Sequence, residues 1–212
     1  PAPSAIGEAM APFAGDGMNR MPGAVSAVAD AEGRVTFDCV GYADLAAKRP
    51  MRPDSLFWIA SNTKGVAAAT FLTVVDEGKI GLDDPVAKHL PGFHAKVTVR
   101  EVLSHTSGLP FFFDMPIDDR PVSLLAQLAA RTKLGSEPGT KYEYSNLGID
   151  VAMAVMEAVT GEPFEKTMRK RILEPLGMYD TTFRPTAEQL ARLVTFYRVD
   201  EKGALREKAV DQ

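Results

Sequence analysis

Residues Phe57 to Asp76 read FWIASNTKGVAAATFLTVVD, which places a serine and a lysine at the start of an apolar helix. Ser61 and Lys64 are three residues apart, so in a helical turn their side chains share one face. A serine hydroxyl is a good nucleophile only when a neighbour accepts its proton, and a lysine can do so when burial leaves its amine neutral. The positive end of the helix favours a neutral amine and a developing alkoxide. The spacing indicates a nucleophile, Ser61, with its proton acceptor, Lys64.

The alternative is a helix-capping serine beside a solvated lysine. With nine serines and eleven lysines in 212 residues, chance alone gives roughly half a match to this spacing. The helix that follows favours chemistry, because residues 67–75 are apolar almost all round and are therefore expected to be buried. A lysine on a buried helix needs a functional reason.

Two valine-rich runs precede this stretch. Residues 23–30 (GAVSAVAD) and 34–42 (RVTFDCVGY) flank a turn-like AEG, which predicts a β-hairpin after a short helix at about 4–13. A lone hairpin is marginally stable in water. Since the other strand candidates, 193–199 and 204–206, are weak, we expect the sheet to be incomplete within these residues.

The chain between the hairpin and residue 193 is mainly helical by pattern. Glycine, proline and capping residues bound the helices that we expect at 65–76, 99–104, 122–133, 146–159 and 164–174.

A second motif, KYEYSN at Lys141 to Asn146, lies between a Pro-Gly turn and an apolar helix. Side chains of a loop before a helix can converge on a site. Tyr144 could pass a proton to a leaving group, and Asn146 could hold Lys64 or a substrate carbonyl. The alternative is that Ser145 or Asn146 caps the helix and the tyrosine is packed.

The three histidines do not suggest another chemistry. His105, in SHTSGLP, sits at a helix end where it can contact the last carbonyls, and it has no acidic partner at a defined spacing, so we favour a structural role over a Ser/His triad. His89 and His94 fit no metal-ligand spacing, and we expect neither a metal nor an organic cofactor.

Composition is that of an ordinary globular protein, with 45% hydrophobic residues, 25% charged residues and a net charge of −4. The charges form no blocks, so we expect a small-molecule ligand and no nucleic acid. No apolar run approaches the roughly 18 residues of a membrane span, and the start lacks the features of a signal peptide. Cys39, the one cysteine, is expected to be a small buried side chain, so periplasmic, secreted and cytoplasmic locations all stay open.

In this order and separation the motifs resemble the serine β-lactamase and penicillin-binding-protein superfamily, specifically the class C β-lactamase-related branch with its family VIII carboxylesterases and D-amino-acid peptidases. The resemblance covers nearly the whole chain. It is carried by GYAD (41–44), FWIASNTK (57–64), EGKIGLDDP (77–85), LSHTSGL (103–109), Pro138-Gly139, YSN (144–146) and EPLGM (174–178).

The resemblance implies an α/β fold of the β-lactamase/transpeptidase type, an antiparallel sheet packed with a large helical region. We expect one domain over 1–212, incomplete at its C-terminus, with helix and hairpin in 1–48, the motif-bearing helical region in 49–193 and the return to the sheet in 194–212. It also implies that Ser61 is acylated by a substrate carbonyl and the acyl group then hydrolysed. Lys64 would be the general base, Tyr144 would assist proton transfer and Asn146 would orient Lys64 and the substrate.

The chain departs from this family at its end. Members continue into three more strands, one of which carries a Lys-Thr-Gly or His-x-Gly motif and lends an N–H to the oxyanion hole beside the amide of the nucleophile. No such motif follows Asn146. Losing one oxyanion donor typically lowers the rate by about 10²- to 10³-fold. We therefore expect a complementary C-terminal fragment or chain to complete the sheet and the site.

The substrate class stays open between an ester, a β-lactam and a peptide. Residues 184–193 (RPTAEQLARL) look more like the esterase-type members, which favours esters. The run Phe111 to Phe113 could wall an acyl pocket, but core packing is the interpretation that we favour. A non-catalytic or penicillin-sensing homologue and a D-amino-acid peptidase are the alternatives.

Overall fold

The computed structural model describes residues 4–18, 20–112 and 121–208 of the chain. Contacts divide it into two compact units. One unit comprises Pro1–Trp58 with Arg184–Gln212, and the other is Ile59–Phe183, which holds all four predicted site residues. The single domain with subdivisions at residues 48 and 193 stays a prediction.

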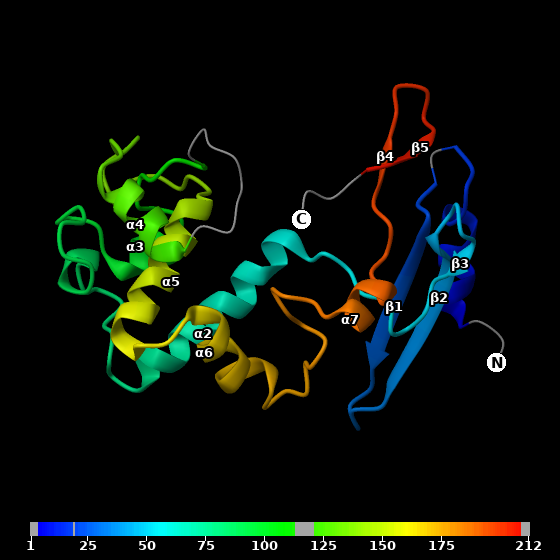
Figure 1. Cartoon of the computed structure of the whole chain (residues 1–212), viewed down its shortest axis with the longest axis horizontal. Helices are drawn as coiled ribbons and strands as arrows, with labels where there is room; N and C mark the ends of the chain where they lie inside the picture. The colour runs from blue at the N-terminus through cyan, green and yellow to red at the C-terminus, as the bar shows by residue number, and fades with distance from the viewer. Residues whose placement is uncertain (1–3, 19, 113–120, 209–212) are drawn as a thin grey trace. The chain divides into compact units, whose positions relative to one another are not determined.

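The first unit contains the predicted hairpin. Strand β1 (Gly23–Ala29) pairs antiparallel with β2 (Val35–Asp44), as Figure 1 shows. In this pairing Gly23 lies opposite Gly41 and Ala29 opposite Val35. Helix α1 (Ala5–Met10) precedes it and is capped by the Ser4 hydroxyl. A two-residue strand, β3 (Arg49–Pro50), adds to the free side of β2, so the sheet is slightly larger than the hairpin that the sequence predicted.

The end of the described chain returns to this unit. Helix α7 (Ala187–Arg192) is followed by β4 (Tyr197–Val199) and β5 (Leu205–Glu207), which pair with each other as a separate two-stranded sheet. Just before β4, the N–H of Thr195 donates to the carbonyl of Ala43 on β2 at 2.8 Å. The two weak strand candidates are therefore strands.

Few apolar side chains are buried in the first unit. Among its described residues only Ala14, Ala43 and Met51 are buried hydrophobics, while Phe37 in β2 is 49% exposed. A sheet is stabilised mainly by an apolar face packed against another layer. Among the described residues of β1 and β2 only Ala43 is buried, so little of this sheet is packed against another layer.

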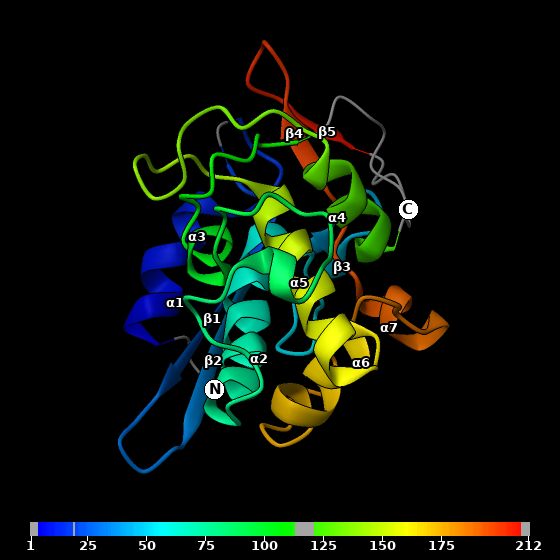
Figure 2. The ribbon, with the colours of Figure 1, turned by 90° about the vertical axis from the view of Figure 1, so that its left-hand side faces the viewer.

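The second unit is helical and holds the main core. Its helices are α2 (Thr63–Asp76), α3 (Val99–Leu103), α4 (Val122–Ala130), α5 (Asn146–Thr160) and α6 (Phe164–Met168), which continues into a π-type turn at Arg169–Leu173. Each predicted helix is present, with α4 shorter than expected. Helix α5 contacts α2, α3, α4 and α6 and is the central helix, as Figures 1 and 2 show.

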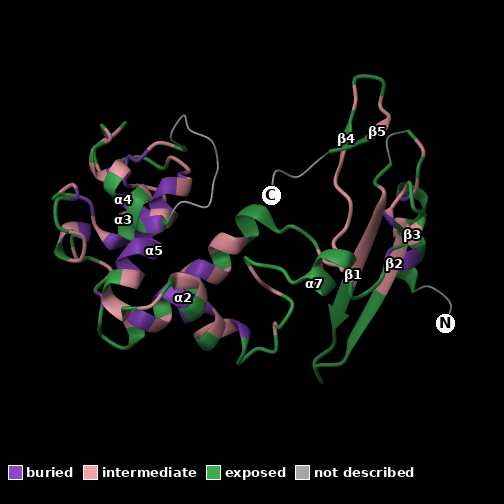
Figure 3. Ribbon diagram, in the orientation of Figure 1, coloured by how far each residue is buried: buried purple, intermediate pink, exposed green. Residues whose placement is uncertain are grey.

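Burial distinguishes the two apolar helices. Nine of the fifteen residues of α5 are buried, seen as its mostly purple ribbon in Figure 3. In α2 only Ala67, Thr70, Phe71 and Val74 are buried, and Leu72 is 43% exposed. The prediction that α2 is buried all round is wrong, because an apolar composition does not say how many faces neighbouring elements cover.

A glycine sets the distance between α3 and α5. A β-carbon on Gly148 would lie 2.8 Å from the carbonyl oxygen of Val102, closer than real side chains approach. The missing side chain lets the first turn of α5 lie directly against α3. This contact fixes the start of α5, where the second motif ends.

We expect Gly148→Ala to lower the free energy of unfolding by about 1–3 kcal/mol, since α5 would have to move away from α3. Gly65→Ala in α2 is the matched control, because a β-carbon there meets nothing within 4 Å. It should raise stability by up to about 1 kcal/mol through helix propensity. Urea unfolding followed by circular dichroism measures both, and equal effects of the two substitutions would contradict the packing argument.

Candidate active site

Ser61 lies in a short 3-10 turn, Ala60–Asn62, immediately before α2. Ala60, the residue before it, has φ 43°, a left-handed conformation that non-glycine residues rarely adopt. Such strain is found most often where a functional side chain must be presented. The turn leaves Ser61 exposed at the start of the helix.

Lys64 reaches Ser61 as the spacing predicted. Its Nζ donates a hydrogen bond to Ser61 Oγ at 3.1 Å and lies 5.0 Å from the centre of the Tyr144 ring. The side chain is half-buried rather than enclosed. The structure therefore brings the predicted nucleophile and base into contact, with less burial than the sequence suggested.

Tyr144 completes this cluster from the other motif. Hydrogen bonding with Lys64, and to a smaller extent with Ser61, lowers the pKa of the Tyr144 phenol. A hydroxyl whose pKa is lowered in this way exchanges protons more readily near neutral pH. The Tyr144 phenol therefore interacts with both Ser61 and Lys64.

Ser145 has a structural task. The residue is fully buried, and its Oγ donates to the Pro110 carbonyl at 2.7 Å and accepts from the Gly148 N–H at 3.1 Å, capping α5. The capping alternative is therefore right for Ser145. The other part of that alternative, a packed tyrosine, does not hold, because the Tyr144 phenol interacts with Ser61 and Lys64.

Asn146 is adjacent, but it does not make the predicted bond to Lys64 in this structure. Its N–H donates to the Phe111 carbonyl at 3.1 Å, and its buried Oδ1 accepts no hydrogen bond from any residue that the structure describes. A buried carbonyl oxygen without a donor is unfavourable. The orienting role of Asn146 stays a prediction.

His105 differs from expectation. Instead of binding the last carbonyls of α3, its Nδ1 accepts a hydrogen bond from the Ser145 N–H at 3.2 Å, and its ring lies 4.6 Å from the Tyr144 ring. Burial, and next the nearby Lys64 charge, lower the pKa of the imidazole. Sequence spacing could not find this contact, because 40 residues separate the two partners.

The exposure of Phe111 is at odds with the expectation that the run Phe111 to Phe113 packs in the core. Phe111 and Phe112 are 52% and 44% exposed, and Phe113 lies outside the described residues. Phe111 and Tyr144 are among the residues that line a hollow of about 540 Å³, together with Leu109, Pro110, Lys133 and Glu143. An apolar wall therefore adjoins the Ser61, Lys64 and Tyr144 cluster.

Asp150, one turn after Asn146 in α5, was not singled out from the sequence. Burial raises the pKa of its carboxyl to about 6, against the opposing effect of the Lys64 charge. The sequence signal that could have found Asp150 was an aspartate within an otherwise apolar helix, because carboxylates are rarely buried unless paired.

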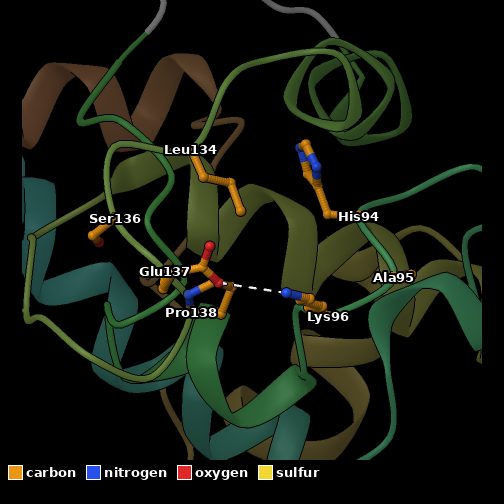
Figure 4. A pocket seen from close by; sticks show the side chains of 7 residues that line it. All are labelled: His94, Ala95, Lys96, Leu134, Ser136, Glu137 and Pro138. Atoms are coloured by element: carbon orange, nitrogen blue, oxygen red, sulfur yellow. Dashed lines mark ion pairs between the residues drawn. The ribbon is translucent and has the colours of Figure 1, made fainter.

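A second hollow lies elsewhere in the same unit. It has a volume of about 380 Å³ and is lined by His94, Ala95, Lys96, Leu134, Ser136, Glu137 and Pro138, with an ion pair of 3.7 Å between Lys96 and Glu137 (Figure 4). It shares no lining residue with the Ser61 cluster. His94 is held by the Ala129 carbonyl at 3.1 Å. The described residues contain no cluster of three potential metal ligands.

The helical unit, the antiparallel sheet and the Ser-x-x-Lys and Tyr-Ser-Asn motifs define a β-lactamase/transpeptidase-like fold. Residues 5–212 match the family model described as Beta-lactamase, and the chain belongs to this family. No helix in the part of the chain that the structure describes is both long and apolar enough to cross a membrane.

Three similar proteins of known kind are an esterase, an amidase and a hydrolase with acyltransferase activity. Esterase EstB from Burkholderia gladioli is 36% identical over 188 residues, covering 77% of this chain and 47% of the esterase. The D-amino acid amidase of Ochrobactrum anthropi SV3, solved with D-phenylalanine, is 31% identical with a TM-score of 0.78 over 93% of this chain and 58% of the amidase. EstCE1, a hydrolase with promiscuous acyltransferase activity, is 29% identical with a TM-score of 0.74 over 88% of this chain and 54% of EstCE1. The resemblance to the superfamily and its esterase-like branch is confirmed.

The chain spans about half the length of these relatives. Its described strands form a three-stranded and a two-stranded sheet.

We expect Asp150→Asn to stabilise the protein increasingly as pH rises. Because the native carboxyl keeps its proton up to about pH 6 and the unfolded one releases it near 4, the contribution of Asp150 to wild-type stability falls across this window. The asparagine variant has no carboxyl to titrate at this position. Its free energy of unfolding, relative to that of the wild type, should therefore grow by up to about 3 kcal/mol between pH 4 and 7. Urea unfolding at several pH values measures the difference.

Asp200→Asn is the control for this pH series. The Ala204 backbone and Arg206 lower the pKa of Asp200, so its ionised form stabilises the fold and its loss should never bring a gain at higher pH. A stability difference for Asp150→Asn that stays flat from pH 4 to 7 would contradict the burial of that carboxyl.

Proposed function

We propose that the protein is a serine hydrolase that cleaves an ester or amide through an acyl-enzyme on Ser61. The observation that carries this proposal is the hydrogen bond of 3.1 Å between Lys64 Nζ and Ser61 Oγ, with the centre of the Tyr144 ring 5.0 Å from the same Nζ. These three groups are a nucleophile, a base and a proton carrier within reach of one another. The relatives, an esterase and an amidase, support the same reaction class.

In the proposed reaction Lys64 first gives its ammonium proton to solvent and then accepts the Ser61 proton as Oγ attacks the substrate carbonyl. Tyr144 then passes a proton to the leaving group, and Asn146 orients the substrate and Lys64. Water releases the acyl group by the same proton transfers in reverse. The backbone N–H of Ser61 would be one oxyanion donor, and a complementary C-terminal part would supply the second.

Esters are the substrate class that we propose first. The half-exposed Phe111 gives the hollow beside Tyr144 an apolar wall, which suits an apolar acyl or alkyl group. The likeness to EstB and EstCE1 favours the same class. The second candidate, hydrolysis of D-amino-acid amides or peptides, is favoured by the TM-score of 0.78 with the D-amino acid amidase. A non-catalytic or penicillin-sensing homologue is the remaining alternative.

We expect a fluorophosphonate probe to label Ser61 in the whole protein, and Ser61→Ala to abolish the labelling. Lys64→Met should slow it by about 10²- to 10⁴-fold, because the proton acceptor is gone. Ser104→Ala is the control, since this exposed hydroxyl in the same unit bonds only to Thr106 Oγ1 among the described partners. Mass spectrometry of the labelled peptide decides the site, and labelling that survives Ser61→Ala would end the proposal.

We expect Phe111→Ala to raise KM for a long-chain nitrophenyl ester by about 10-fold, as loss of a buried aromatic contact would. The change for an acetyl ester should be small. Phe112→Ala is the matched control, because Phe112 is similarly exposed but does not line the hollow. A chromogenic cephalosporin and a D-alanyl amide in the same assays separate the ester, β-lactam and peptide classes. Equal effects of the two substitutions would contradict the acyl-wall role of Phe111.

A further inference from the structure

His105 makes contacts between the turn after α3 and the loop that carries Tyr144. It lies just after α3 with φ 59°, a left-handed conformation that is uncommon for a residue with a side chain. Its carbonyl accepts the Glu143 N–H at 2.8 Å. The backbone of the turn after α3 is thereby tied to the loop that carries Tyr144.

The imidazole adds a second tie to the same loop. Nδ1 accepts the N–H of Ser145, a residue with no exposed surface, at 3.2 Å. A buried N–H needs an acceptor, and an N–H can only donate. The bond therefore requires an Nδ1 that carries no proton, which is the neutral ring with its hydrogen on Nε2.

The ring also packs on the tyrosines of this loop. It lies 4.6 Å from the Tyr144 ring at an interplanar angle of 35°, and 5.9 Å from the Tyr142 ring at 86°. Backbone and ring contacts thus hold Tyr144 from two sides. The same tyrosine interacts with Ser61 and Lys64 through its phenol.

The charges around His105 oppose its protonation. Burial lowers the pKa of the imidazole, and the charge of Lys64 on α2 lowers it further. On the tyrosine loop, the carboxylate of Glu143 is engaged by Lys141 at 2.8 Å. On α5, Asp150 interacts with Lys64, and burial raises the pKa of its carboxyl to about 6.

We propose that His105 is a positioning residue for Tyr144: the neutral imidazole holds the Ser145 N–H and the Tyr144 ring so that the phenol meets Ser61 and Lys64, and protonation of the imidazole releases this hold. The proposal rests on the proposed function, because it assigns Tyr144 a part in acylation. It predicts that Ser61 reacts more slowly at acid pH for a reason that lies in His105.

Two substitutions separate the parts of this role. His105→Asn keeps an acceptor near the Nδ1 position, tolerates the left-handed backbone and does not titrate. His105→Phe keeps an aromatic ring but leaves the buried Ser145 N–H without an acceptor. The Asp150→Asn background removes the carboxyl that titrates in the same range, and each variant is made in it in the whole protein.

The first measurement is the rate of fluorophosphonate labelling of Ser61 between pH 5 and 8. At pH 7.5 the asparagine variant should stay within about 3-fold of the parent, whereas the phenylalanine variant should be slower by about 10-fold, as expected for an orphaned buried donor. The decline of the rate on acidification should move to lower pH in His105→Asn. Unchanged rates in His105→Phe, or the same pH profile in parent and His105→Asn, would overturn the proposal.

A second measurement does not depend on catalysis. Nitrogen NMR of the histidine side chains should show His105 with its proton on Nε2 and a pKa below that of an exposed histidine, and Tyr144 ring signals should change as His105 titrates. Absence of labelling at every pH together with these NMR signatures would refute the proposed function and leave His105 as the residue that holds Tyr144. A proton on Nδ1, or Tyr144 signals that ignore the His105 titration, would refute the positioning role itself.

Discussion

The candidate site depends on the burial of Ser145. Its hydroxyl joins the Pro110 carbonyl to the first turn of α5, and its N–H faces the His105 imidazole. Because Ser145 has no exposed surface, water cannot replace a lost partner, and the loss of any of these bonds would leave a buried polar group unpaired. The position of Tyr144, one residue earlier, follows from these bonds. These bonds thereby hold the loop that carries Tyr144 against the first turn of α5.

Lys64 is the electrostatic centre of the same region. Its hydrogen bond lowers the pKa of the Tyr144 phenol. Its charge lowers the pKa of the His105 imidazole and acts in the same direction on the Asp150 carboxyl. Burial adds to this effect on the histidine and opposes it on the aspartate, because burial disfavours the charged form of each group. A single ammonium therefore favours a readily ionised phenol and a neutral imidazole beside it, while a buried carboxyl on α5 retains its proton more strongly than usual.

Much of the fold could be predicted from the sequence. The hairpin, the helices and the capping of α5 follow from local patterns, and so does the contact between Ser61 and Lys64, whose geometry a single helical turn supplies. The prediction that α2 is buried all round was wrong, and so was the preference for packing Phe111 in the core. Both depend on which neighbours cover a surface, and composition carries no information about them. His105 and Asp150 were missed as parts of the site because their partners lie on other elements.

The sequence by itself determined the family, the helical and strand elements, and the pair of Ser61 with Lys64, since short-range spacing and motif order are properties of the chain. Only the tertiary structure decided that Tyr144 meets this pair, that His105 binds Ser145, that Asn146 Oδ1 has no donor among the described residues, and that Phe111 lines a hollow. These facts arise where α2, α3 and α5 pack together. Their side-chain contacts join residues tens of positions apart, and the packing of one helix on another, including the close approach at Gly148, sets the distances among them.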